Sequence, residues 1–143
     1  MNEDKDVVFS IPDTVDIWKK MQGKGLKKLL IILDQKSQNE PNLAILSKMM
    51  SAIKYDLDED VHLLFLDSKS TISLGASAIS YHDLIVFGIE PPQLGIHVEY
   101  EVGKILNFEH SRVLFCEHFE IVIPDHQKKN HLWKNLQNMF LNT

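Results

Sequence analysis

Two aspartates follow runs of apolar residues, and they are the side chains in this sequence with the clearest chemical potential. Asp34 follows the run at residues 29–33, and Asp67 follows the run at residues 61–66. If both runs are parallel strands, the two carboxylates lie at the edge of the sheet where open α/β proteins bind ligands. Such a pair could hold a metal ion or activate a water molecule. We favour the simpler interpretation that each aspartate caps a turn, because no third ligand or nucleophile stands at a recognisable spacing.

The other reactive residue types do not form a recognisable site. His126 and His131 are five positions apart, which places them on different faces of a helix, and no Cys or His pair has zinc-like spacing. Cys116, the single cysteine, follows an apolar run, so we interpret it as a small buried side chain in a reducing compartment. The chain has neither a phosphate-binding glycine loop nor a Gly-x-Ser-x-Gly elbow. We therefore expect no metal and no cofactor.

Length and charge favour one cytoplasmic domain. The chain has 143 residues, of which 44% are hydrophobic, and this is enough for one core. We take residues 1–143 as a single domain in which residues 1–12 are a candidate flexible segment. The formal net charge of −5 disfavours binding of duplex DNA by the whole surface, although it leaves contact through a local basic patch open. No long apolar stretch follows the acidic start, so the sequence predicts neither a signal peptide nor a membrane anchor.

The apolar patterns predict the elements that would position these residues. Continuous apolar runs predict buried strands at residues 29–33, 61–66 and 84–89. Apolar residues three or four positions apart predict amphipathic helices at residues 13–23, 41–55 and 126–141. Residues 104–108 and 112–116 form either the two arms of a hairpin or a single sheet strand. The order of strand, helix and strand predicts an α/β fold with three layers and a central, mostly parallel sheet of about four strands.

Two parts of the sequence resemble a known family. One is the predicted strand at residues 83–89 together with the segment at residues 91–95, and the other is the apolar pattern within residues 132–140. These patterns resemble the psi subunit of bacterial DNA polymerase III and its relatives, and the resemblance covers about residues 27–141. It implies a sheet similar to that of the uracil-DNA glycosylase superfamily. It also implies a non-catalytic adaptor.

From this resemblance we expect a protein that binds other proteins within a replication complex. The expected partners are chi-like or clamp-loader subunits, with contact to single-strand-binding protein only through them. An extended apolar segment near the N-terminus could add to the edge or groove of a partner. The candidate partner-binding residues are Val8, Phe9 and Ile11 in that segment, and Pro91, Pro92 and Leu94 after the third strand.

Two alternatives stay open. The first is an enzyme of the uracil-DNA glycosylase type, with Asp34 and His126 as its suspected catalytic residues. In this chain His126 follows Pro124, whereas the enzymes place their histidine before the proline, and the loop after Asp34 lacks their glycine. The second alternative is a module that binds a small ligand or a second copy at the strand ends.

Overall fold

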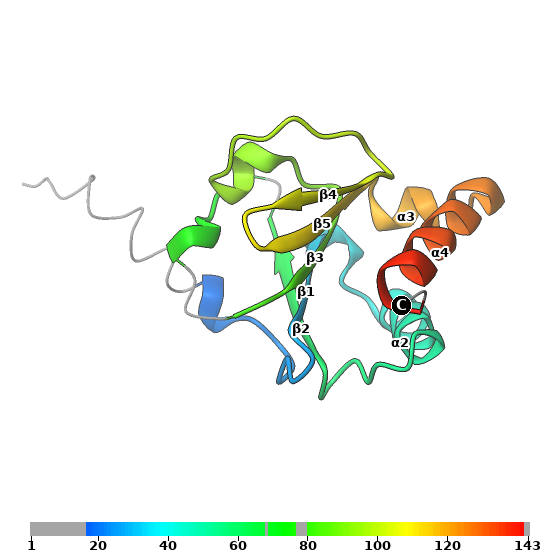
Figure 1. Ribbon diagram of the computed structural model, residues 1–143. Coiled ribbons are helices and arrows are strands. Elements are labelled where there is room, and N and C mark those ends of the chain that lie inside the picture. The colour runs from blue at the N-terminus through cyan, green and yellow to red at the C-terminus, as the bar shows by residue number, and fades with distance from the viewer. Residues whose placement is uncertain (1–16, 68, 77–79, 142–143) are drawn as a thin grey trace, which may run out of the picture.

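A computed structural model describes residues 17–67, 69–76 and 80–141, and in it a central sheet carries helices on one face (Figure 1). Within these residues the sheet has five strands in the order β2-β1-β3-β5-β4. Their bounds are β1 Leu29–Asp34, β2 Val61–Leu66, β3 Asp83–Phe87, β4 Ile105–Phe108 and β5 Ser111–Cys116. Strands β2, β1, β3 and β5 run parallel, and β4 runs antiparallel to β5. The predicted α/β class and mostly parallel sheet are therefore confirmed, with five strands instead of about four.

The central strands β1 and β3 are apolar except for one terminal aspartate each, Asp34 and Asp83, because both faces of the sheet are covered. Every residue of β1 and of β3 is buried. Alternate residues of β1 contribute to different cores, since Ile31 belongs to the cluster on one face and Ile32 to the cluster on the other. This two-sided burial explains why the sequence shows continuous apolar runs where a half-exposed strand would show alternation.

Three helices cover one face of the sheet: α2 Glu40–Ala52, α3 Phe119–Val122 and α4 His126–Phe140. Asn39 caps the start of α2 by accepting a hydrogen bond from the backbone N–H of Asn42, and Asp125 caps α4 in the same way through Gln127 and Lys128. The expected helices at residues 41–55 and 126–141 are therefore present with slightly shorter bounds. The sequence patterns did not predict α3.

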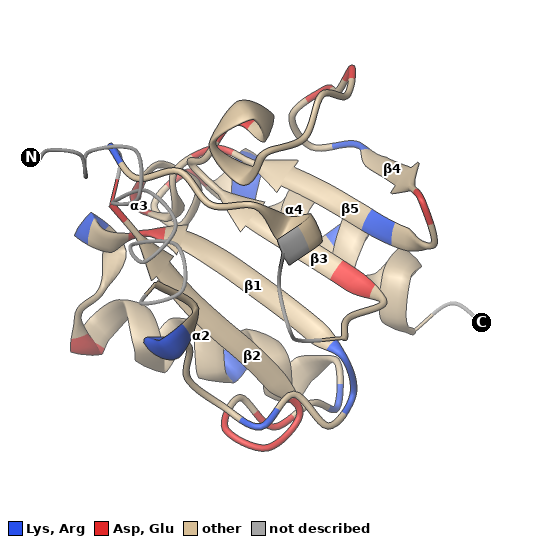
Figure 2. Ribbon diagram, turned by 90° about the vertical axis from the view of Figure 1, so that its left-hand side faces the viewer, with Lys and Arg blue, Asp and Glu red and all other residues tan. Residues whose placement is uncertain are grey.

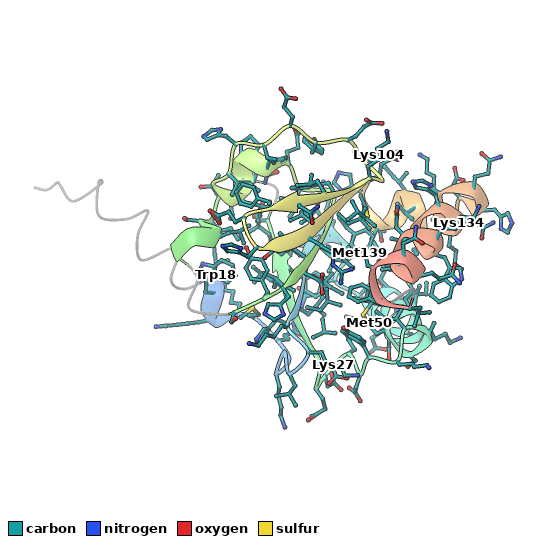
Figure 3. All side chains as sticks on the ribbon, viewed as in Figure 1. Trp18, Lys27, Met50, Lys104, Lys134 and Met139 are labelled. Carbon is teal, nitrogen blue, oxygen red and sulfur yellow. The ribbon has the colours of Figure 1, made fainter. Side chains whose placement is uncertain are left out.

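The opposite face is covered differently. Among the described residues it carries a helical segment at residues 17–19, within the helix expected at residues 13–23, and the 3₁₀ turn η3 Pro91–Leu94, together with extended chain. Figure 3 shows Trp18 on this side of the sheet and Met50 and Met139 on the helical side. In the part that the structure describes, the predicted second helical layer is therefore represented by the helical residues 17–19 and by short 3₁₀ turns. The start of the helix expected at residues 13–23 lies outside that part.

The strand order identifies the edge of the sheet where a site is expected. From β1 the chain passes through α2 to β2 on one side, whereas β3 lies on the other side of β1 and is followed in the sheet by β5. Open α/β sheets bind ligands where neighbouring connections diverge in this way, beyond the carboxyl ends of the strands. In this protein that place lies at the ends of β1 and β3.

No helix among the described residues is long and apolar enough to span a bilayer.

Candidate functional site

Asp34 and His118 meet at the carboxyl edge of the sheet. Asp34 is the last residue of β1, and His118 stands two residues after β5 and precedes α3. Asp34 Oδ2 lies 3.3 Å from His118 Nδ1, and the side chains are 5% and 49% exposed. Because β3 lies between β1 and β5, the imidazole reaches across the end of β3 to make this contact. A buried carboxylate therefore holds one end of a half-exposed imidazole.

Gly88, the residue after β3, leaves the space that this contact needs. Its φ is 72°, a left-handed conformation that side chains rarely adopt, and a Cβ at this position would collide with His118 Nδ1. Its backbone N–H also donates to the carbonyl oxygen of Cys116 at 2.9 Å, which extends the pairing between β3 and β5. Glycine is therefore required here by the backbone and by the imidazole above it.

The second carboxylate oxygen of Asp34 has a structural role. Oδ1 accepts a hydrogen bond from the backbone N–H of Lys36 at 3.0 Å and so caps the 3₁₀ turn η1 Gln35–Ser37. With one oxygen used by the turn and the other by His118, the carboxylate is held in one orientation. If Nδ1 of His118 carries the proton, Nε2 is the hydrogen-bond acceptor of the ring. This arrangement could move a proton to or from a bound molecule.

A polar link ties the start of α2 to α3. Nδ2 of Asn39 and Nδ2 of Asn42 lie 3.5 and 3.3 Å from Oε2 of Glu120. Asn42 Nδ2 also donates to the carbonyl oxygen of Ser37 at 3.0 Å. These bonds join the segment that follows Asp34 to the helix that follows His118, so they help to fix the two side chains relative to each other.

The other candidates for strand-end chemistry lie elsewhere. Asp67 caps a turn by accepting from the backbone N–H of Lys69 at 2.9 Å, and it is exposed. His126 begins α4, where its Nε2 lies 3.2 Å from Nδ2 of Asn130. The described residues contain no group of three or more His, Cys, Asp or Glu side chains that could hold a metal ion. The histidine that pairs with Asp34 is therefore His118, which the sequence reasoning missed although it also follows an apolar strand.

The predicted partner-binding residues after β3 divide between core and surface. Leu94 is fully buried and Pro91 is buried, and both belong to η3, which covers the sheet. Pro92 is exposed. The side chains of Leu94 and Pro91 thus pack against this protein's own sheet. The other three candidates, Val8, Phe9 and Ile11, lie outside the described residues.

A mainly apolar hollow of about 220 Å³, which we call the Gly103 pocket, lies on one flank of α4. The carbonyl oxygen of Gly103 accepts hydrogen bonds at 2.8 Å from Nε2 of His131 and from Nδ2 of Asn135. Cys116 also lines the pocket, and burial raises the pKa of its thiol to about 12. The thiol is therefore protonated at neutral pH and is a poor nucleophile.

A second hollow, of about 430 Å³, lies between α2 and α4, and we call it the α2–α4 groove. Its half-buried apolar residues are Ile45, Met49 and Trp133. Two exposed lysines also line it, Lys48 from α2 and Lys129 from α4. The sequence predicted these side chains as helix residues, but the groove exists only because α2 and α4 pack on the same face of the sheet.

No family model, curated protein or solved structure matches this chain.

Proposed function

We propose that this chain is a non-catalytic adaptor that binds other proteins in the cytoplasm. The observation that carries this proposal is the presence of apolar hollows on both flanks of α4, the Gly103 pocket and the α2–α4 groove. Val102, at the edge of the first hollow, is 49% exposed, and Ile121 on α3 is 46% exposed. Apolar residues gathered around surface hollows are typical of surfaces that bind proteins.

The resemblance to the psi subunit makes the proposal more specific. Trp133, part of the pattern on which that resemblance depends, lines the α2–α4 groove. A mostly parallel sheet is also compatible with the uracil-DNA glycosylase-like fold that the resemblance implies. We therefore propose a psi-like accessory subunit of a replicative polymerase clamp-loader complex, with chi-like or clamp-loader subunits as its partners.

Affinity capture from the native cell tests this proposal. The full chain carries a tag and is expressed at its natural level, and the proteins that co-purify are identified by mass spectrometry. We expect chi-like or clamp-loader subunits to be enriched over a control in which the tag alone is expressed. Enrichment of no replication protein in repeated captures at moderate salt would reject the psi-like role.

A second function is favoured by the Asp34–His118 pair. A fixed carboxylate beside an imidazole is the arrangement that a base-excising enzyme would need to activate water and stabilise a leaving base. If the chain is such an enzyme, incubation with a uracil-containing single strand produces abasic sites, and Asp34→Asn and His118→Ala each remove the activity. His126→Ala is the matched control and should be fully active. Unchanged substrate at high protein concentration would eliminate this alternative.

A further inference from the structure

We propose that the α2–α4 groove binds an acidic, amphipathic helical segment of a partner protein. This inference rests on the proposed role in binding other proteins and goes beyond it by naming the surface and the chemistry of the partner. It depends on three observations: the shape of the apolar floor, the charge of the two lysines at the groove, and the scarcity of acidic residues on the described helices of this chain.

The apolar floor fits a short helix. On α2 it extends from Ile45 to Ala52, which is two helical turns or about 10 Å. Met49 lies in the middle and Trp133 faces it from α4, and both are only half-buried. Methionine adapts its shape to an incoming side chain, and tryptophan is enriched where proteins bind each other. The floor therefore has room for two apolar side chains one turn apart, as at positions i and i+4 of a helix.

The charge of the groove determines which sign of charge the partner segment should carry. Lys48 and Lys129 are exposed and form no ion pair with any described residue, whereas the neighbouring Lys128 lies 2.7 Å from Glu117. Helix α4 contains three lysines and no acidic residue. The groove is therefore locally basic although the whole chain has a net charge of −5. Complementary charge at the rim of an apolar contact favours an acidic partner and raises its association rate.

The described helices of a second copy would be poor occupants. The only acidic residues on α2, α3 and α4 are Glu40 and Glu120, and each lies in the first turn of its helix. Glu120 is already hydrogen-bonded to Asn39 and Asn42. None of these three helices carries an acidic stretch beside apolar side chains. The chemistry of the groove therefore points to a different protein.

Fluorescence of Trp133 gives a direct test. The chain has two tryptophans, and Trp18 lies on the opposite side of the sheet, so Trp18→Phe leaves Trp133 as the only tryptophan (Figure 3). The probes are two synthetic helical peptides with the same leucines at i and i+4, one with glutamates and the other with lysines at the remaining positions. We expect a saturable change in Trp133 emission with the glutamate peptide and at least tenfold weaker binding of the lysine peptide.

Charge-reversal variants show whether the groove is responsible. In the same background, Lys48→Glu with Lys129→Glu should weaken binding of the glutamate peptide at least tenfold. The matched control is Lys19→Glu with Lys20→Glu, which makes the same change in net charge at a turn away from the groove and should leave the affinity unchanged. The proposal is rejected by equal affinity for the two peptides, by equal effects of the two double variants, or by no change in emission at millimolar peptide.

Repeating the affinity capture with the groove variant separates this inference from the proposed function. Partners that the wild-type chain captures and that the Lys48→Glu, Lys129→Glu variant loses support both proposals. Equal capture by both chains rejects the groove and leaves the adaptor role standing. Capture of no partner by the wild-type chain rejects the adaptor role itself.

Discussion

Asp34 ends β1 and Asp67 directly follows β2, one register position further along, and the surroundings of the two side chains differ. Both accept a hydrogen bond from the backbone N–H two residues later. Asp34 is also buried and contacts His118, whereas Asp67 is exposed. The pair of aspartates therefore allows the contribution of the imidazole contact to be separated from that of the turn.

We predict that Asp34→Ala lowers the free energy of unfolding by about 1.5 kcal/mol, because a buried, charge-assisted contact is lost with the turn. Asp67→Ala, which loses only an exposed turn bond, should cost about 0.5 kcal/mol. Urea denaturation of the three proteins measures both values. Equal losses for the two variants would show that the His118 contact contributes nothing to stability.

Cys116 makes stability depend on pH in the alkaline range. Burial raises the pKa of this thiol from 9.0 to about 12, so between these values the folded chain keeps a proton that the unfolded chain releases. The contribution of this thiol to the free energy of unfolding is fully present below pH 9 and is lost as the pH rises towards 12. We predict that the wild type loses about 1.4 kcal/mol per pH unit relative to Cys116→Ala in this range. Parallel stability curves for the two proteins, measured by urea denaturation, would contradict this.

At the scale of elements, α2 ends at a residue whose backbone conformation is unfavourable for its side chain. The backbone N–H of Tyr55 bonds to the carbonyl of Met50 and that of Lys54 to the carbonyl of Ser51, which is the Schellman pattern. Glycine is usual at the position of Lys54, whose φ is 69°. The helix therefore ends through a left-handed lysine.

We predict that Lys54→Gly stabilises the protein by about 1 kcal/mol, since glycine adopts this conformation without a steric penalty. Thermal unfolding followed by circular dichroism measures the gain as a higher Tm. Lys54→Ala is the control, because it removes the same lysine side chain but retains a Cβ. A gain of similar size with alanine would mean that loss of the lysine, and not the backbone conformation, is responsible.

For the whole molecule, the distribution of charge disfavours direct binding to duplex DNA. Figure 2 shows acidic and basic residues interspersed, with the sheet itself largely uncharged. With a net charge of −5, the chain has no excess of cations to release counterions from a phosphate backbone. If the chain acts in replication, we expect its contact with DNA to be made through partner proteins.

We predict that fluorescence anisotropy with a labelled duplex detects no saturable binding below about 100 μM protein at physiological salt. The Lys48→Glu, Lys129→Glu variant provides an internal check, because it should also show no saturable binding to the duplex. Micromolar binding by the wild type that disappears in this variant would mean that the groove binds nucleic acid and not an acidic protein segment.

Local patterns predicted much of the fold because the spacing of apolar residues in the sequence reflects which faces of a strand or helix are buried. Strand β2 was expected at the residues where it occurs, and the hairpin of β4 and β5 was one of the two interpretations of residues 104–116. Helix α3 was missed because its four residues are too short to show a helical period. The 3₁₀ turn η3 over the second face was not predicted either, since irregular segments that bury single apolar side chains have no repeating pattern.

The sequence by itself determined the α/β class, the buried strands and the place of Asp34 at a strand end. Only the tertiary structure decided which histidine meets that aspartate, because the answer depends on the strand order. Strand β3 lies between β1 and β5, and Gly88 leaves the space across which His118 reaches Asp34. The α2–α4 groove was also decided by the tertiary structure. Apolar periodicity shows that a helix has a buried face, but it does not show which neighbouring helix that face meets.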